Sequence, residues 1–270
     1  MRLAPGGPAA SPPTPTRSET EMSPGGAALV YEGRDLEAMS FARNYHRWIV
    51  SEFRPYLGDT VAEVGAGSGN VSEMLLAEPI RRLVAVEPSE QMYPLLARRL
   101  ADEPRARTEQ AFFSAIHERH RGAFDTVVYV NVLEHVPDDA GELRCVWETL
   151  KPGGHLCVFV PALQWLYSDF DASIGHYRRY HREPLRRLLR GAGFEVVRLR
   201  YFDSLGILPW LVVFRLMRRR LAGSDVAAYD RWAVPLLRAV EPRVPVPLGK
   251  NLLAVARKPA QGNDSAVAVY

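Results

Sequence analysis

The chain has 270 residues, of which 47% are hydrophobic and 24% charged, as is ordinary for a globular protein with a substantial core. Its formal net charge of +3 is too small to indicate a nucleic-acid partner, so none is expected. The positive charge is concentrated in residues 176–222, which contain twelve arginines and three acidic residues.

Cysteine content and the termini bear on redox state and compartment. Only Cys145 and Cys157 occur, without the Cys/His spacing typical of metal ligands, so we expect reduced thiols and no metal site. The N-terminus lacks the apolar core of a signal peptide, and no apolar run approaches the ~20 residues that span a bilayer. The sequence therefore predicts a cytoplasmic protein, with membrane contact only at its surface.

The ends of the chain differ in composition from its middle. Residues 1–27 are rich in Pro, Gly, Ser and Thr and are predicted to form a disordered tail. A single domain is expected over 28–260, followed by a short tail over 261–270. The domain should begin with an amphipathic helix over Leu36–Phe53, which Arg54-Pro55 closes.

Short apolar runs and helical patterns alternate through the rest of the domain. The predicted strands are Thr60–Val64, Leu83–Glu87, Arg107–Gln110, Thr126–Val130, Leu156–Val160, Glu195–Tyr201 and Leu252–Ala256. The predicted helices between them are Val71–Leu76, Glu90–Leu100, Gly141–Leu150 and Glu183–Leu189. This alternation indicates an α/β fold with a mainly parallel sheet.

Two connections are longer than such a sheet needs, and long ordered insertions at a sheet end usually carry function. Residues 161–182 follow the fifth strand and are predicted to form a substrate loop. Residues 202–250 precede the last strand and are predicted to form a cap or an interfacial insertion. In open α/β sheets the ligand crevice lies beyond the carboxyl ends of the strands.

A glycine-rich turn after the first strand is the strongest motif. In Glu63-Val64-Gly65-Ala66-Gly67-Ser68-Gly69, the glycines permit positive φ and allow a ligand to approach bare backbone. Nicotinamide-dependent oxidoreductases, the main alternative, prefer a third glycine one residue later. Glu63 is also poorly placed for a pyrophosphate, whereas a cationic zwitterion would tolerate it. Glu87 ends the second strand twenty residues after Gly67, an offset at which an acid can accept ribose hydroxyls.

Two further motifs follow in order: Asn131-Val132-Leu133-Glu134-His135-Val136 and the turn Lys151-Pro152-Gly153-Gly154. With them, residues 31–200 resemble class I S-adenosylmethionine-dependent methyltransferases. The resemblance implies a Rossmann-like sheet of seven strands, the last antiparallel, with helices on both faces. It also implies S-adenosylmethionine as cofactor and methyl transfer to a small-molecule, glycan or lipid-linked acceptor, on oxygen or nitrogen.

The same resemblance implies roles for individual residues at the cofactor. Glu63 would hold the methionine end, Glu87 the ribose, and Asn131 would lie beside the methionine amine. The backbone at Gly65, Ala66, Gly67 and Gly69 would pack against the ligand. Gln110 and Ala111, after the third strand, would lie at the edge of the adenine ring. The sequence departs from many relatives at Gln110, where they carry Asp. Phe112 or Phe113 could stack on the adenine, although both suit a core.

Two histidines are the catalytic candidates, because a hydroxyl acceptor needs a base. His176 is the first choice, since histidine titrates near neutrality. It lies in Gly175-His176-Tyr177-Arg178-Arg179-Tyr180, which is similar to a segment of a bacterial subgroup linked to glycan, lipid and secondary-metabolite pathways. His135 is the rival base, or else it supports its loop through a hydrogen bond.

The same insertion offers side chains for the acceptor. Arg178 and Arg179 could bind a phosphate or carboxylate of an anionic acceptor, with Tyr167 nearby. The structural alternative is that His176 and one arginine brace Asp169 or Asp171.

Residues 205–220 combine an apolar stretch, Leu205–Met217, with Arg218-Arg219-Arg220. A membrane-surface helix would suit a lipid-linked acceptor. An active-site cap or a dimer surface fits the same pattern, and oligomeric state is left open. Two other function classes are also kept: an NAD(P)-dependent oxidoreductase and a catalytically silent adaptor with a methyltransferase fold.

Overall fold

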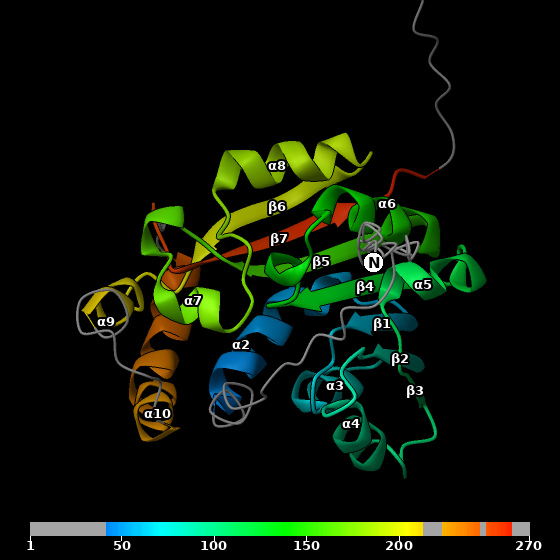
Figure 1. Cartoon of the computed structure of the whole chain (residues 1–270), viewed down its shortest axis with the longest axis horizontal. Helices are drawn as coiled ribbons and strands as arrows, with labels where there is room; N and C mark the ends of the chain where they lie inside the picture. Colours follow the sequence, from blue (N-terminus) through cyan, green and yellow to red (C-terminus); the bar gives the residue numbers. More distant parts are fainter. Residues whose placement is uncertain (1–41, 213–222, 244–246, 261–270) are drawn as a thin grey trace, which may run out of the picture.

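A seven-stranded sheet forms the centre of the computed structural model, which describes residues 42–212, 223–243 and 247–260 (Figure 1). The strands are β1 (Thr60–Val64), β2 (Arg82–Val86), β3 (Ala106–Glu109), β4 (Phe124–Val130), β5 (Leu150–Pro161), β6 (Glu195–Phe202) and β7 (Asn251–Arg257). Their spatial order is β3-β2-β1-β4-β5-β7-β6, and β7 is antiparallel to both neighbours. The predicted α/β class, strand number and antiparallel last strand are confirmed.

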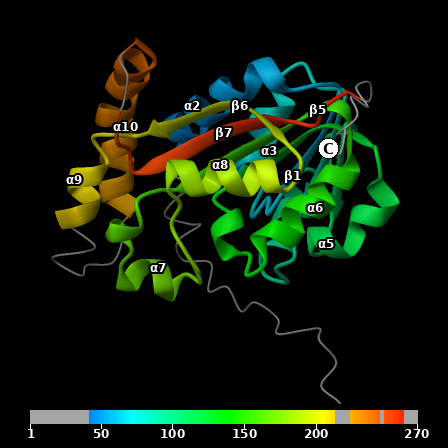
Figure 2. The same ribbon diagram turned by 90° about the horizontal axis from the view of Figure 1, so that it is seen from above.

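Helices cover both faces of the sheet (Figure 2). One face packs against α2 (Arg43–Phe53), α3 (Asn70–Leu76), α4 (Tyr93–Arg99) and α10 (Gly223–Val240). The other packs against α5 (Phe113–Ile116), α6 (Asp139–Thr149) and α8 (Arg182–Gly191). Because both faces are covered, the central strands β1 and β4 are buried along most of their length, and their sequences are nearly continuous apolar runs.

The edge strands are less buried, which explains why their sequence signal is weaker. β3 lies at one edge and buries only Glu109, and β6 lies at the other edge with its first four residues exposed or half-buried. The continuous apolar run that predicted β1 and β4 is therefore absent from most of β3.

The start of β5 corrects one sequence prediction. The strand begins at Leu150 rather than Leu156, so the predicted turn over 151–154 lies inside it. Leu150 pairs with Phe124, and the register then shifts before His155 pairs with Thr126. Gly153 has a φ of +80° in this irregularity, which a glycine accommodates without strain.

Both insertions contain helices, as was expected for the second one, near the C-terminal end; the helix in the first insertion was not predicted. Residues 161–182 include α7 (Asp169–Ser173), and residues 202–250 include α9 (Ile207–Trp210) as well as α10. The predicted tails, 1–27 and 261–270, and the start of the Leu36–Phe53 helix lie outside the described residues, as do 213–222 and 244–246. Across the described ranges, every helix is too short or too polar to cross a bilayer.

Candidate active site

The glycine turn after β1 is held by the neighbouring strand. The amides of Gly65 and Ala66 both donate to the carbonyl of Val86, at 2.8 and 3.0 Å. Gly65 and Gly67 have φ values of +68° and +56°, and a Cβ on Gly65 would lie 2.5 Å from a methyl carbon of Val132. Glycine is thus required at Gly65 both by backbone conformation and by space.

One cavity of about 1340 Å³ opens beside this turn, at the carboxyl ends of β1, β2 and β4. That volume exceeds the roughly 300–1,000 Å³ typical of a single ligand site, so cofactor and acceptor can share it. Predicted cofactor residues in its wall are Glu63, Gly65, Ala66, Gly67, Glu87, Ala111 and Asn131. Their binding roles stay predictions.

Glu63 is buried in this wall with 3% of its surface exposed. It accepts a hydrogen bond of 2.5 Å from the Ser72 hydroxyl. Burial raises the pKa of Glu63 to about 8, the nearby charge of Glu87 acts in the same direction, and the Ser72 hydrogen bond opposes both. Since a cation beside Glu63 would favour the carboxylate, this end of the cavity suits an ammonium or sulfonium group.

Glu87 ties the glycine turn to the end of β2. Its two carboxylate oxygens accept from the amide of Gly67 at 2.7 Å and from the amide of Ser89 at 2.9 Å. Burial raises the pKa of Glu87, and these two hydrogen bonds act against that rise. A carboxylate has about four lone-pair sites, so Glu87 keeps acceptor capacity for ribose hydroxyls.

Two predicted cofactor residues are not part of this cavity wall, and their binding roles also stay predictions. Gln110 is exposed and outside the cavity wall. Gly69, with a φ of +88°, precedes α3 and lies against the side chains of Leu96 and Arg99. The structure also separates the two phenylalanines, because Phe113 is buried against Tyr129 whereas Phe112 is 49% exposed in the wall.

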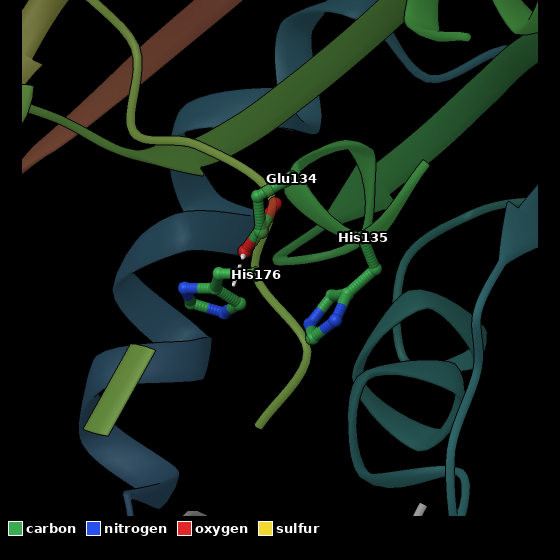
Figure 3. Close-up of side chains that lie close together, drawn as sticks. All are labelled: Glu134, His135 and His176. Atoms are coloured by element: carbon green, nitrogen blue, oxygen red, sulfur yellow. Dashed lines mark ion pairs between the residues drawn. The ribbon is translucent and has the colours of Figure 1, made fainter. Parts of the chain in front are cut away.

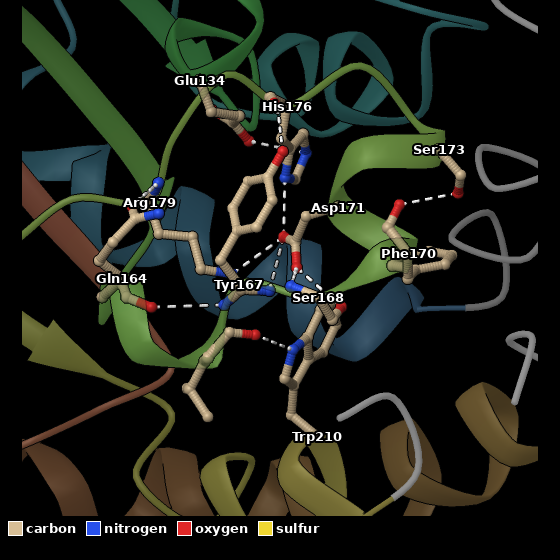
Figure 4. A network of polar contacts seen from close by, with 12 residues as sticks. Glu134, Gln164, Tyr167, Ser168, Phe170, Asp171, Ser173, His176, Arg179 and Trp210 are labelled. Carbon is tan, nitrogen blue, oxygen red and sulfur yellow. Dashed lines mark hydrogen bonds and ion pairs between the residues drawn. The ribbon is translucent and has the colours of Figure 1, made fainter. Parts of the chain in front are cut away.

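Asp171 organises the loop at the other end of the cavity (Figure 4). This fully buried carboxylate accepts from the amide and hydroxyl of Ser168, from Nδ1 of His176 and from Nε of Arg179, each at 2.9 Å. Burial raises the pKa of Asp171, but the hydrogen bonds from His176 and Arg179 outweigh it and hold the pKa below its ordinary value. His176 and one arginine therefore do brace Asp171, as the structural alternative proposed.

Of the three predicted acceptor residues, only Arg179 reaches the cavity wall. Its guanidinium lies over the ring of Trp210, 4.4 Å from the centroid. Arg178 instead donates to Asp139 and to the carbonyl of Pro137, both at 2.7 Å. Tyr167 donates to the carbonyl of His176 at 2.6 Å and likewise lies outside the wall. Arg178 and Tyr167 thus make contacts that hold the loop, and their predicted acceptor roles stay predictions.

The two candidate catalytic histidines meet in the wall, together with an acid that the sequence analysis did not select (Figure 3). The rings of His135 and His176 are 4.6 Å apart and nearly perpendicular. Glu134 is fully buried, and its Oε1 lies 3.8 Å from Nε2 of His176. We refer to Glu134, His135 and His176 as the Glu-His-His cluster.

Burial affects the cluster's acid and one of its bases in opposite senses. It raises the pKa of Glu134 to about 7, against the opposing charge of His176. Burial and, to a smaller extent, the nearby charge of His176 together lower the pKa of His135 to about 4. Ligand atoms from the three side chains lie within 4.8 Å of one another, so the cluster could hold a metal ion. Sequence spacing did not reveal it because His176 comes 41 residues after His135.

The described part of residues 202–250 contributes to the cavity wall, and its role as cap or interfacial insertion stays a prediction. Asp203, fully buried, accepts from the hydroxyls of Tyr45 and Tyr229 and from Nζ of Lys250. Asp230 accepts from the amides of Asn44 and Tyr45 in α2, at 3.0 and 2.8 Å. These buried contacts join α10 to α2 beside the cavity.

The sequence matches the family described as a methyltransferase domain over residues 33–199. The chain belongs to this methyltransferase domain family. The class I S-adenosylmethionine-dependent family recognised from the sequence is thereby confirmed, and with it the cofactor.

Two curated relatives carry the name ubiquinone biosynthesis O-methyltransferase. The one from Ralstonia nicotianae is 33% identical over 115 residues, covering 40% of this chain and 45% of the relative. The one from Methylocella silvestris is 29% identical over 196 residues, covering 67% and 63%. The match thus spans less than two thirds of either relative's length.

A solved structure shows the same fold. The crystal structure of a SAM-dependent methyltransferase from Archaeoglobus fulgidus superposes with a TM-score of 0.55 at 16% identity, covering 83% of this chain and 99% of that one.

Proposed function

We propose that the protein transfers the methyl group of S-adenosylmethionine to a hydroxyl oxygen of a small-molecule acceptor. The observation that carries this proposal is a single cavity whose wall contains the glycine turn, the two acids Glu63 and Glu87, and the Glu-His-His cluster. The relatives named O-methyltransferase support oxygen as the acceptor atom.

At the cofactor end, the chain's contribution is binding and charge. S-adenosylmethionine supplies a methyl group already activated as a sulfonium. The ammonium of its methionine part pairs with the Glu63 carboxylate, and Glu87 accepts hydrogen bonds from the ribose. The buried wall excludes water and aligns the two reactants, from which much of the rate enhancement of such a displacement comes.

At the acceptor end, the hydroxyl must lose its proton as the oxygen attacks. The first candidate base is His176, because Asp171 accepts from its Nδ1 and leaves Nε2 as the basic nitrogen. His135 is the second, and burial keeps its imidazole neutral. Arg179, buried against Trp210 in the wall, favours an acceptor with an anionic group.

Ligand-dependent thermal unfolding tests the class of enzyme. S-adenosylhomocysteine at a hundred times its Kd should stabilise the protein by about 2.7 kcal/mol, which raises Tm by roughly 5–10 °C. NAD⁺ and NADP⁺ should leave Tm unchanged. A rise in Tm with a nicotinamide cofactor but not with S-adenosylhomocysteine would overturn the proposal and indicate an oxidoreductase. If no ligand raises Tm, the catalytically silent adaptor would be favoured.

The acceptor atom is tested by transfer of labelled methyl to matched phenol and aniline acceptors, each with and without a carboxylate. We expect label on the phenol oxygen, with preference for the carboxylate-bearing compound. Exclusive labelling of the anilines would overturn the assignment to oxygen. Glu183→Ala, on the exposed side of α8, serves as a control variant with full transfer.

Exposed apolar side chains support a lipid-linked acceptor and membrane-surface contact as part of this proposal. Leu208 on α9 is 66% exposed, and Trp232 and Leu236 on α10 are 73% and 59% exposed. The proposal predicts flotation with vesicles that contain anionic lipid and a loss of flotation in Trp232→Asp. If the wild-type protein does not float with the vesicles, membrane-surface contact would be excluded and a water-soluble acceptor would be favoured.

A further inference from the structure

We propose that the Glu-His-His cluster binds a divalent first-row transition-metal ion, and that this ion binds the acceptor hydroxyl. Binding of the acceptor hydroxyl by the ion rests on the proposed function, whereas metal binding itself rests on the cluster alone. Glu134 and His135 follow β4, His176 follows α7, and all three lie in the wall of the same cavity (Figure 3).

The spacing of the cluster is close to that of a metal site. One ligand atom from each residue lies within 4.8 Å of the other two. Because metal–nitrogen and metal–oxygen bonds are about 2.0–2.2 Å long, two ligand atoms of one ion lie at most ~4.4 Å apart. Three ligand atoms spread evenly around one ion lie about 3.4–3.6 Å apart, so each atom would move inward by less than about 1 Å to share one ion.

The carboxylate of Glu134 provides an independent reason to expect a cation. Neither of its oxygens has a hydrogen-bond partner of normal geometry, although the side chain is fully buried. The nearest cationic candidate is Nε2 of His176, at 3.8 Å, beyond hydrogen-bond distance. An unpaired buried carboxylate is costly, and a divalent ion in the cluster would supply the missing partner.

The groups behind the histidines resemble the outer shell of a metal site. A ligating histidine usually donates its other ring N–H to a carboxylate or a backbone carbonyl, which fixes the ring. Nδ1 of His176 lies 2.9 Å from Asp171, which leaves Nε2 on the side of Glu134. The ring of His135 makes a hydrogen bond with the backbone of Gly175.

The charges around the cluster leave room for a cation. Arg179 is the nearby arginine, and its Nε and Nη2 both contact the Asp171 carboxylate, at 2.9 and 2.8 Å. The charge of Arg179 also favours the ionised form of Glu134. Two carboxylates, Asp171 and Glu134, therefore share one arginine beside two imidazoles.

The ligand types narrow the choice of ion. Two imidazole nitrogens and one carboxylate suit manganese, iron(II), cobalt, nickel or zinc, and three protein ligands leave coordination positions open. An acceptor hydroxyl in such a position loses its proton more easily, and the proton passes to water. The oxygen then forms its bond to the methyl carbon while the carbon–sulfur electron pair returns to sulfur. In this case His176 would bind the metal ion instead of acting as the base, and the ion would activate the acceptor hydroxyl.

Metal titration of the full-length protein tests the site without reference to turnover. After dialysis against a chelator, the protein is titrated with Co²⁺ and followed by absorption, and with Zn²⁺ and followed by calorimetry. We expect one ion per chain. Glu134→Gln, His135→Gln and His176→Asn should each weaken binding at least about tenfold, and Asp171→Asn about ten- to a hundredfold.

The matched controls are another histidine and another acid of the cavity wall. His46 and Glu142 are buried there outside the cluster, so His46→Gln and Glu142→Gln should bind Co²⁺ like the wild type. S-adenosylhomocysteine-induced stabilisation, measured in every variant, shows that the fold and the cofactor site are intact.

Co²⁺ binding weaker than about 1 mM would overturn the metal site, as would equal affinity in the wild type and Glu134→Gln. If S-adenosylhomocysteine still binds in that case, the methyltransferase proposal survives and His176 keeps its role as base. If metal binds but S-adenosylhomocysteine does not, the proposed function fails and the metal site stands. Loss of hydroxyl methylation on chelation, restored by the ion, would support the second half of the proposal.

Discussion

Glu63 and Glu87 line the same cavity, yet their carboxylates are stabilised differently. Glu87 accepts from two backbone amides, whereas Glu63 accepts from one hydroxyl and has a pKa of about 8. Well below pH 8, most of Glu63 is therefore protonated in the free protein. A ligand ammonium that favours the carboxylate must displace this proton on binding.

We therefore expect the affinity for S-adenosylhomocysteine to rise with pH up to about 8, by at most tenfold per pH unit. Calorimetry in buffers of different ionisation enthalpy should detect close to one proton released below this pH. Glu63→Gln should remove both the slope and the proton release. A wild-type affinity that is flat between pH 6 and 8 would contradict this role of Glu63.

The raised pKa of Glu63 also affects stability in the cofactor-free protein. Because the folded-state pKa is above the ordinary value of 4.5, the protonated side chain favours folding at low pH. That contribution is lost as pH rises from about 4.5 through 8. Glu63→Gln should accordingly raise Tm at pH 9 by a few degrees, roughly 2–4 °C per kcal/mol, with a smaller effect at pH 5. A lower Tm at pH 9 would be inconsistent with this argument.

Removal of the Glu87 carboxylate should weaken the cofactor site through two losses. Glu87→Ala removes the predicted ribose contact and the two backbone hydrogen bonds that hold the glycine turn. We expect S-adenosylhomocysteine to bind about 1–3 kcal/mol more weakly by calorimetry. Glu90→Ala, three residues further along the same wall, is the control with near wild-type affinity. Unchanged affinity in Glu87→Ala would exclude Glu87 from the site.

At the scale of elements, the turn between β1 and α3 depends on Gly65 in two separable ways. Gly65→Ala places a Cβ 2.5 Å from Val132 at a φ of +68°. Gly122→Ala imposes a similar φ, +60°, with nothing within 4 Å of the added carbon. The second variant therefore measures conformational strain alone, of order 1 kcal/mol.

Gly65→Ala should lose about 1–3 kcal/mol more than Gly122→Ala in urea unfolding, because it adds a clash in a packed site. It should also reduce the binding of S-adenosylhomocysteine, which Gly122→Ala should not. Equal losses of stability in the two variants would mean that Val132 moves aside without cost.

The elements also show which features a sequence can reveal. β1 and β4 were predictable because helices cover both their faces, and burial then requires a continuous apolar run. α7 was missed because it spans only Asp169–Ser173 and its capping residue Ser168 bonds Asp171, a contact without helical periodicity. The cofactor turn could be predicted from adjacent residues. The Glu-His-His cluster could not, since α6, β5 and the start of the insertion lie between His135 and His176.

At the scale of the whole molecule, two separate cores lie on the two faces of the sheet, and only some of their helices border the cavity. Trp48 of α2 is fully buried, with its ring 3.8 Å from that of Phe202, and α2 also carries Tyr45 and His46 into the cavity wall. Leu189 of α8 is equally buried on the opposite face. No residue of α8 is part of the wall.

Trp48→Ala and Leu189→Ala should both be destabilised, by about 3–5 and 2–5 kcal/mol, because each leaves a cavity in a packed core. Their response to ligand should differ. The Tm rise with S-adenosylhomocysteine should be preserved in Leu189→Ala and reduced in Trp48→Ala, since a shift of α2 moves the wall. Thermal unfolding with and without ligand measures both quantities in one experiment. An equal reduction in the two variants would mean that the site depends on global stability rather than on the face that α2 covers.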